Sequence, residues 1–207
     1  MTQNINLKQS HTNHIIYKSL KRTEDIVVAT IILILISPIM LIVAIGIKAS
    51  SPGPIFYRQT RVTLYNKKFE MLKFRSMPAN TEQNGVQWGG SKSKTNTKFG
   101  QFIRATSLDE LPQFLNVLKG DMSIVGPRPE RDIFIDKFAQ EIPNYLDKHE
   151  VKAGITGWAQ INGWRGDTSL EKRIEFDLYY INNWTLWFDI KIIFLTIFKG
   201  FINKNSY

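Results

Sequence analysis

The sequence predicts a mainly helical α+β protein that is held in a membrane by one hydrophobic segment near its N-terminus. Residues 26–47 contain no charged side chain. A straight helix over this run would be about 33 Å long, enough to cross a hydrocarbon core of about 30 Å. Two later segments, 55–59 and 68–75, have the composition of short strands. Apolar residues recur at helical spacing at 101–119, 132–140 and 170–181.

The overall composition is that of a globular protein with a basic surface. The chain has 207 residues, 43% of them hydrophobic and 22% charged, which predicts one or at most two domains with a core. The formal net charge is +9. Nucleic acid, an anionic membrane face or phosphate-bearing substrates would each suit that charge, and the charge alone does not choose between them.

Cysteine and histidine usage excludes several kinds of site. The chain has no cysteine, so disulfides, thiolate metal sites and cysteine nucleophiles are excluded. Two of the three histidines, His11 and His14, lie in a polar N-terminal tail. A zinc site or a Ser/His triad would therefore depend on His149 alone, and we expect neither.

The hydrophobic segment is interrupted in its middle by Ser37-Pro38. Pro38 cannot donate a hydrogen bond to the carbonyl of Ile34, so the helix should kink or break there. Both flanks are basic, which favours the cytoplasmic side for each of them. These flanking residues are Lys18, Lys21, Arg22, Lys48, Arg58 and Arg61. The pattern leaves two forms open, a kinked transmembrane helix and a re-entrant helix whose two ends lie on the same face.

Three regions follow from these patterns: a polar tail over 1–17, a membrane segment over 18–50 and a globular domain over 51–207. Residues 79–100 are rich in small and polar side chains and predict a long loop. The stretch 184–201 mixes tryptophan, phenylalanine and aliphatic residues with a few charges. It can be a helix in the membrane interface or an ordinary core helix, and both remain open.

Two adjacent carboxylates, Asp109 and Glu110, lie in the sequence Ser107-Leu-Asp-Glu-Leu-Pro112. Ser107 and Glu110 have the spacing of a helix capping box. Pro112 disfavours that interpretation, because it would fall beyond the first turn. A helix that starts nearer Asp109 would place Pro112 in its first turn and both carboxylates at the positive end of the helix.

Several basic residues have the chemistry to bind phosphate beside these carboxylates. Arg128 lies between Pro127 and Pro129, which stiffen the backbone that presents its guanidinium. A solvated arginine in a stiff turn is the simpler alternative. Three further basic candidates are Lys73, Arg75 and Arg104. Together these cations could neutralise a diphosphate, and oxygens of the carboxylate pair would suit Mg²⁺.

The chain resembles the bacterial sugar transferases, the monotopic polyprenol-phosphate phosphoglycosyl transferases, through ordered motifs that cover roughly residues 18–207. The C-terminal motifs, from Ile161 to Ile190, look most like the catalytic core of the undecaprenyl-phosphate glucose phosphotransferases of exopolysaccharide synthesis. The motifs that precede them are Lys21-Arg-Thr-Glu-Asp25, the Pro38-broken run, Ser51-Pro-Gly-Pro-Ile-Phe-Tyr-Arg-Gln59, Phe69-Glu-Met-Leu-Lys-Phe-Arg-Ser-Met77, Ser107-Leu-Asp-Glu-Leu-Pro-Gln113, Ser123-Ile-Val-Gly-Pro-Arg-Pro129 and Gly154-Ile-Thr-Gly-Trp-Ala-Gln160.

The resemblance implies the transfer of a sugar-1-phosphate from a UDP-sugar to undecaprenyl phosphate, with release of UMP. Asp109 would be the nucleophile that forms a covalent phosphosugar intermediate, and Glu110 would help to hold Mg²⁺. Arg104 and Arg128 would bind phosphate. Lys73, Arg75 and Asp177 also match family motifs, and their roles are less defined.

The resemblance also implies a membrane arrangement. Pro38 would turn the helix back, so that the protein lies on the cytoplasmic face of the bacterial inner membrane with its catalytic domain in the cytoplasm. The chain departs from the family in two places. Thr63-Leu-Tyr65 stands where members usually have glycine, and Trp164 precedes Arg165 where small members often have Asn-Gly-Arg, so that a phosphate role for Arg165 is left open.

Two other functions are weighed against the transferase. A non-catalytic membrane scaffold of a polysaccharide assembly complex would explain the membrane segment, but it gives no reason for Asp109, Glu110 and Arg128 to occur together. A nucleic-acid partner is not expected, because the sequence has no helix-turn-helix, RRM or KH signature. The sugar is not fixed by the sequence, with glucose and then galactose favoured by resemblance, and a homo-oligomer is left open.

Overall fold

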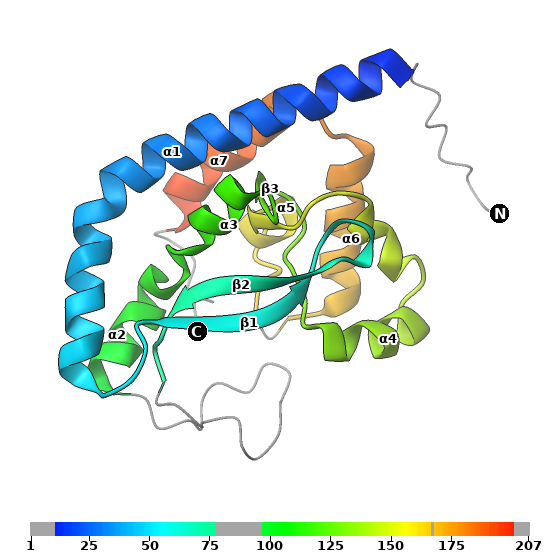
Figure 1. Cartoon of the computed structure of the whole chain (residues 1–207). Coiled ribbons are helices and arrows are strands. Elements are labelled where there is room, and N and C mark those ends of the chain that lie inside the picture. The colour runs from blue at the N-terminus through cyan, green and yellow to red at the C-terminus, as the bar shows by residue number, and fades with distance from the viewer. Residues whose placement is uncertain (1–10, 78–96, 167, 201–207) are drawn as a thin grey trace.

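One long, bent helix, α1 (His11–Ser50), lies along the outside of a small domain (Figure 1). The structure is a computed structural model, and it describes residues 11–77, 97–166 and 168–200. Within α1, the segment Tyr17–Ser50 is long and apolar enough to cross a membrane, and only 11% of its apolar window is buried in the protein. Such an exposed apolar surface distinguishes α1 from the core helix of a soluble domain. The helix begins earlier than the expected residue 18, so residues 11–17 are helical rather than tail.

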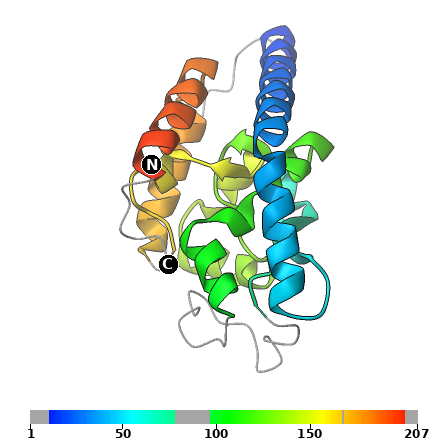
Figure 2. The same cartoon turned by 90° about the vertical axis from the view of Figure 1, so that its left-hand side faces the viewer.

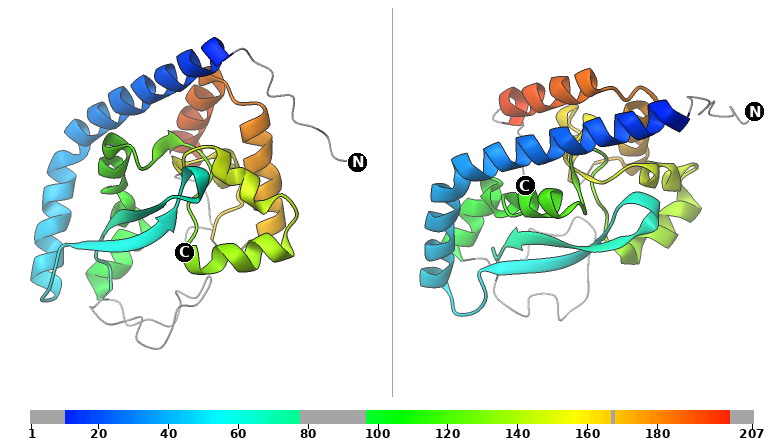
Figure 3. Two further views of the ribbon diagram at one scale, coloured as in Figure 1. Left: turned by 45° about the vertical axis from the view of Figure 1, so that its right-hand side comes forward. Right: turned by 45° about the horizontal axis from the view of Figure 1, so that its top comes forward.

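The predicted interruption of the helix at Pro38 is seen as a bend within a continuous α1. The first part of the helix passes over the domain, and the part after the bend descends along its side (Figures 1 and 3). Pro38 has no N–H to give to the Ile34 carbonyl, and the Ser37 hydroxyl donates to that carbonyl instead at 2.9 Å. The dipeptide therefore bends the helix and also satisfies the acceptor that the proline leaves without its usual donor.

The two predicted strands form an antiparallel hairpin, β1 (Phe56–Val62) and β2 (Lys68–Phe74). Tyr65 and Asn66, in the connection between them, have left-handed backbone conformations, with φ of 55° and 59°. Glycine adopts such a conformation at less cost, and the resemblance described above predicts a glycine near this point. The chain keeps the turn without a glycine.

The helical pattern over 101–119 corresponds to three separate elements. They are α2 (Lys98–Ala105), the 3₁₀ turn η2 (Leu108–Glu110) and α3 (Gln113–Lys119). Pro112 immediately precedes α3, and the Ser107 side chain caps no helix. A helical turn therefore does start next to Asp109, with both carboxylates in it, but it is a separate 3₁₀ turn, and α3 begins only at Gln113, after Pro112.

The remaining elements complete the domain around a second, very small sheet. Two parallel strands, β3 (Ser123–Val125) and β4 (Gly154–Thr156), form this sheet. The expected helices at 132–140 and 170–181 are α4 and α6, and the stretch from 184 contains α7 (Figures 1 and 2). The bounds are α4 (Asp132–Glu141), η3 (Tyr145–Glu150), α5 (Trp158–Ile161), α6 (Leu170–Asn182) and α7 (Leu186–Gly200). Most of the expected tail and of the loop at 79–100 lies outside the described residues.

The main hydrophobic core joins α1 to the domain. Its fully buried members include Ala29 of α1, Val117 of α3 and Ile192 of α7. A smaller cluster joins the part of α1 beyond the bend to β2 and α2, through Ile47 and its neighbours. The two halves of α1 therefore each have their own packing partners in the domain.

Two arginines reinforce this attachment at opposite ends of the apolar segment. Before it, Arg22 donates to the carbonyls of Val117 and Leu118, at 2.6 and 2.7 Å, at the C-terminal end of α3. After it, Arg75 donates to the carbonyls of Ser51 and Pro52 directly beyond α1. The apolar segment is thus fixed to the domain on both sides.

Candidate active site

The carboxylate pair lies in a short, sharply turned segment between two helices. Ser107 has φ of 57°, a conformation that few residues other than glycine adopt without cost. This conformation turns the chain away from the direction of α2 and starts η2, which carries Asp109 and Glu110. Backbone strain of this kind recurs at functional sites, where the surrounding structure maintains it.

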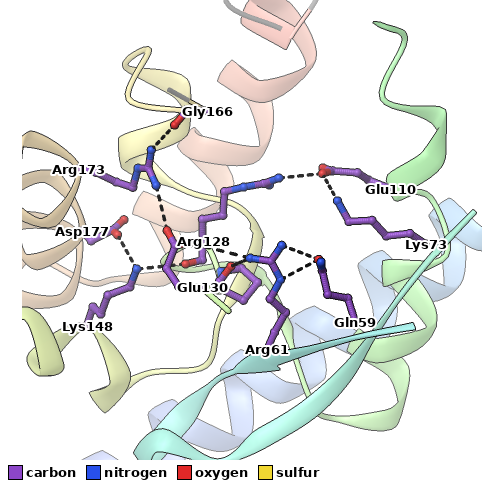
Figure 4. Close-up of polar contacts among 11 residues, drawn as sticks. Gln59, Arg61, Lys73, Glu110, Arg128, Glu130, Lys148, Gly166, Arg173 and Asp177 are labelled. Atoms are coloured by element: carbon purple, nitrogen blue, oxygen red, sulfur yellow. Dashed lines mark hydrogen bonds and ion pairs between the residues drawn. The ribbon is translucent and has the colours of Figure 1, made fainter. Parts of the chain in front are cut away.

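Glu110 is held by cations from three different parts of the chain. Its Oε1 accepts from Lys73 Nζ at 2.9 Å and from Arg128 Nη2 at 2.8 Å (Figure 4). Its Oε2 lies 3.4 Å from Arg165 Nη2, and the same nitrogen lies 3.5 Å from the Ser107 hydroxyl. Strand β2, the loop after β3 and the loop after α5 therefore converge on one carboxylate. This convergence brings Lys73, Arg128 and Glu110 together as expected.

Asp109 and Glu110 have opposite electrostatic environments. Burial raises the pKa of Asp109 to about 6, against the opposing charge of Lys73 and, more weakly, of Arg104 and Arg128. Burial also acts on Glu110, but the charges of Arg128, Lys73 and Arg165 outweigh it and hold the pKa of Glu110 well below its usual range. Asp109 is therefore the carboxylate of the pair that gains or loses its proton near neutral pH.

The segment that presents Arg128 is fixed through four successive backbone carbonyls. The carbonyls of Pro127 and Glu130 accept from the backbone N–H groups of Gly154 and Val62. Between them, the Arg128 carbonyl accepts from Lys148 Nζ at 3.1 Å and the Pro129 carbonyl from Arg61 Nη1 at 3.0 Å (Figure 4). The expected stiffness of the Pro-Arg-Pro sequence is thus reinforced by donors from three other elements.

Gly126 allows this segment to lie directly against β4. A Cβ at that position would collide with the carbonyl of Lys152, so a side chain has no room there. The Gly126 N–H donates to the Thr156 carbonyl at 2.9 Å, which extends the pairing of β3 with β4. The close approach explains why glycine precedes the Pro-Arg-Pro sequence.

Two residues expected from the family motifs lie apart from this cluster. The Arg75 guanidinium is buried against Ser51 and Pro52, as described above, and contributes to the end of α1. Asp177 of α6 is almost completely buried, and its Oδ2 lies 3.7 Å from Lys148 Nζ (Figure 4). Lys148 thus links Asp177 to the backbone of Arg128.

The residues that sequence reasoning missed are the ones behind Arg128. Lys148 and Arg173 give no signal in the sequence, because a lysine or arginine in a helical stretch is most often a surface charge. In the structure Arg173 is buried, with its Nη1 at 2.9 Å from Glu130 Oε1 and its Nη2 at 2.7 Å from the Gly166 carbonyl (Figure 4). Only the pairing with buried carboxylates shows that these cations belong to the interior.

The donor set is compatible with a single divalent cation. Mg²⁺ is commonly bound by one or two protein carboxylates together with substrate phosphates and water. Asp109 and Glu110 supply two such carboxylates, and Glu110 Oε2 has only the long contact with Arg165. Among the described residues, no group of three or more acidic or histidine side chains could form a cage around a metal ion. The site therefore fits a metal that shares its coordination with a phosphate ligand.

Two adjacent, largely covered carboxylates, surrounded by more cations than anions and carried beside a long apolar helix, are the features expected of a membrane-associated class of protein with a site for phosphate. Comparison with known proteins identifies the group within that class. The chain belongs to the bacterial sugar transferase family, whose model matches residues 16–203.

Several similar proteins have undecaprenyl phosphate in their names. The UDP-glucose:undecaprenyl-phosphate glucose-1-phosphate transferase of Escherichia coli (strain K12) is 55% identical over 91% of this chain. The protein of the same name from Caulobacter vibrioides is 40% identical over 90% of the chain. The undecaprenyl-phosphate galactose phosphotransferase of Salmonella typhimurium is 41% identical over 86% of it. The match covers 41%, 72% and 39% of these relatives, respectively, so the chain spans less than half the length of two of them.

Proposed function

We propose that the protein transfers a sugar-1-phosphate from a UDP-sugar to undecaprenyl phosphate and releases UMP, as the first step in assembling an exopolysaccharide or related glycan. The observation that carries this proposal is the environment of Asp109. A nearly buried carboxylate with a raised pKa lies among Lys73, Arg104 and Arg128, whose charges suit the phosphates of a nucleotide sugar. The names of the relatives support the same substrates.

The site supports a two-step transfer through Asp109. An oxygen of the Asp109 carboxylate attacks the phosphorus that bears the sugar, and the bond from that phosphorus to UMP breaks as UMP leaves with the bonding electrons. An oxygen of undecaprenyl phosphate then attacks the same phosphorus and releases the Asp109 carboxylate. Each step forms one phosphorus–oxygen bond and breaks one. Arg104 and Arg128 would stabilise the charge that develops on the phosphoryl oxygens.

Glu110 has a different role from its neighbour. Its three cationic contacts keep it ionised, so it orients Lys73, Arg128 and Arg165 around the reacting phosphate rather than attacking it. Asp109 and Glu110 would hold Mg²⁺, which supplies neutralisation of phosphate charge when bound. Removal of divalent cations with EDTA is expected to abolish UMP release, and added Mg²⁺ to restore it.

The membrane attachment fits a helix that enters and leaves the same face of the bilayer. The bend at Pro38 and the fixation of α1 to one domain on both sides of its apolar segment support this re-entrant form, since a crossing segment would have its two sides separated by the bilayer. Both ends and the domain would then lie in the cytoplasm, where UDP-sugars are made available. Ile34, Leu35 and Ile42 have the most exposed large side chains on the apolar segment and would face lipid.

A second apolar face, on α7, supports an interfacial position for that helix. Trp187, Ile190, Phe194 and Ile197 recur at helical spacing and are each about half or more exposed, whereas Ile192 on the other face is fully buried. A tryptophan at the edge of such a face suits the lipid headgroup region. α7 and the first part of α1 lie on the same side of the domain, because both are in the upper part of the molecule in Figure 1 and again in Figure 2, which is turned about the vertical axis.

The activity is tested with purified protein, Mg²⁺ and a panel of UDP-sugars, with and without undecaprenyl phosphate. We expect UMP release and a lipid-linked sugar diphosphate of the mass that the accepted sugar dictates, with UDP-glucose the first candidate and UDP-galactose the second. Without the lipid, a phosphosugar adduct should appear on Asp109 in peptide mass spectra. Absence of UMP release with every UDP-sugar would overturn the proposal, and full activity of Asp109→Asn would overturn the covalent step. Asp136→Asn, in an exposed aspartate of α4, is the matched control.

The membrane arrangement is tested with single cysteines, because the chain has none of its own. In intact cells, Ile15→Cys and Ser50→Cys should both be protected from a membrane-impermeant maleimide, and both should react after the cells are permeabilised. Labelling of either one in intact cells would show that α1 crosses the bilayer.

A further inference from the structure

A pair of opposite charges lies buried directly behind the arginine that faces the carboxylate pair. Lys148 of η3 is 1% exposed and Asp177 of α6 is 2% exposed. Their side chains approach to 3.7 Å, between Lys148 Nζ and Asp177 Oδ2 (Figure 4). Buried charges are costly unless they are well paired, and an apolar pair of similar size often packs with greater stability. The position therefore calls for a role beyond stability.

That role follows from what else the Lys148 ammonium contacts. Its Nζ donates to the backbone carbonyl of Arg128 at 3.1 Å, while the side chain of Arg128 extends the other way to Glu110 (Figure 4). One ammonium thus joins the Asp177 carboxylate to the peptide whose guanidinium contacts Glu110. Because Asp177 faces Lys148, it lies on the side of Arg128 away from Glu110 (Figure 4).

The chemistry of the Pro-Arg-Pro sequence makes such outside donors necessary. Pro127 and Pro129 have no N–H, so this segment cannot be fixed by its own backbone donors at those two positions. It offers carbonyls instead, and each carbonyl from residue 127 to 130 accepts a hydrogen bond from another element. Among these four bonds, the bond to Arg128 itself is the one made by Lys148.

We propose that Lys148 and Asp177 are positioning residues for Arg128: Asp177 holds the Lys148 ammonium, and that ammonium fixes the Arg128 peptide so that its guanidinium meets the phosphates of the nucleotide sugar. This inference rests on the proposed phosphate role of Arg128. It assigns Asp177 a function through Lys148, where the family motif left its role undefined.

A double-mutant cycle tests the proposal, with the rate of UMP release in a single turnover as the readout. Lys148→Met should lower that rate by about 10- to 100-fold, the range in which a slightly misplaced group reduces catalysis. Lys148→Arg, which keeps a donor and a charge, should stay within a few-fold of the native rate. In an Arg128→Ala background, Lys148→Met should lower the rate little further, because the guanidinium that Lys148 positions is already absent.

Two control variants separate a positioning role from loss of structure, and the rate of Arg128→Ala separates it from failure of the proposed function. The double variant Lys148→Met/Asp177→Leu replaces the buried charges with apolar side chains and should fold, as judged by thermal unfolding, yet show the same low rate. Lys172→Met, which removes a lysine of an exposed ion pair on α6, should leave the rate unchanged. Equal losses from Lys148→Met in the native and Arg128→Ala backgrounds would overturn the inference. A native rate for Arg128→Ala would instead overturn the proposed phosphate role.

Discussion

Asp109 and Glu110 are adjacent in the chain, yet the protein moves the pKa values of their carboxyl groups in opposite directions. Burial raises the pKa of Asp109 to about 6, whereas the cations around Glu110 hold its pKa well below the usual range in spite of burial. The difference arises because Glu110 contacts Lys73, Arg128 and Arg165 at 2.8 to 3.4 Å. The site thus has one permanently ionised carboxylate and one whose charge depends on pH.

The first prediction concerns the pH dependence of the half-reaction. Only the ionised form of Asp109 can attack phosphorus, so the rate of UMP release without a lipid acceptor should rise about tenfold per pH unit up to about pH 6 and level off above it. Leaving out undecaprenyl phosphate removes the titration of the lipid phosphate from the profile. A rate that is independent of pH between 4.5 and 7.5, which we take as roughly the range of the assay, would contradict the assignment of Asp109 as nucleophile.

The profile needs a control, because burial also raises the pKa of Asp177 to about 6. An Asp177→Asn variant is expected to react more slowly, since it weakens the positioning of Arg128. Its apparent pKa should nevertheless stay near 6, because Asp109 still titrates. Loss of the acid limb in this variant would show that Asp177 was the group observed.

The second prediction concerns the influence of Glu110 on its neighbour. The negative charge of Glu110 raises the pKa of Asp109. Glu110→Gln should therefore shift the acid limb of the half-reaction to lower pH, although the maximal rate falls because three cations lose their shared carboxylate. Lys73→Met should shift the limb to higher pH, since the Lys73 charge lowers the pKa of Asp109. Shifts of the same sign in both variants would contradict this account.

The third prediction concerns the bend in α1. Pro38→Leu restores an N–H that can donate to the Ile34 carbonyl, and removal of the proline ring permits a straight helix. A cysteine at position 15 should then become reactive in intact cells, because a straight α1 would cross the bilayer. Pro54→Ala, in a proline outside the helix, should leave that cysteine protected. Continued protection in Pro38→Leu would show that the domain contacts, rather than the proline, determine the topology.

The fourth prediction concerns the attachment of α1 before its apolar segment. Arg22→Met removes two charge-assisted hydrogen bonds to the carbonyls of Val117 and Leu118, at an expected cost of about 2–4 kcal/mol. The apparent melting temperature in detergent should fall by about 5–10 °C. Lys18→Met, which changes an exposed lysine on the same helix, should leave it within about 2 °C, because surface substitutions rarely alter stability much. Equal melting temperatures for the two variants would contradict the structural role of Arg22.

Sequence reasoning predicted well the elements whose apolar residues recur at a regular spacing, and the bend where a proline cannot donate a backbone hydrogen bond. Pro38 identified the bend in α1, and the strand-like segments around residues 56 and 70 formed the hairpin β1–β2. The sheet of β3 and β4 was missed because three-residue strands give too little periodicity to detect. The start of α3 at Gln113 was not predicted, because nothing in the sequence indicates that Ser107 adopts a left-handed backbone conformation.

For the site, sequence reasoning found the residues that have unusual neighbours in the chain. Glu110 follows a second carboxylate and Arg128 lies between prolines, so both stand out in the sequence itself. Arg165 was considered through the resemblance, with its role left open, and its distance to Glu110 places it at the site. Lys148 and Arg173 are cations in ordinary surroundings, and only their distances to Asp177 and Glu130 identify them. Interactions between residues so far apart in sequence are set by tertiary packing, which a local pattern does not encode.

The fixation of α1 by Arg22 before its apolar segment and by Arg75 after it has a further consequence for catalysis. Because the apolar segment is fixed to one domain on both sides, the depth at which it inserts also sets the depth of the domain relative to the membrane. The height of the Asp109 carboxylate above the hydrocarbon surface would then be a constant of the fold. A polyprenol phosphate anchored in the same leaflet would meet the enzyme by lateral diffusion alone, in two dimensions, whatever the length of its tail.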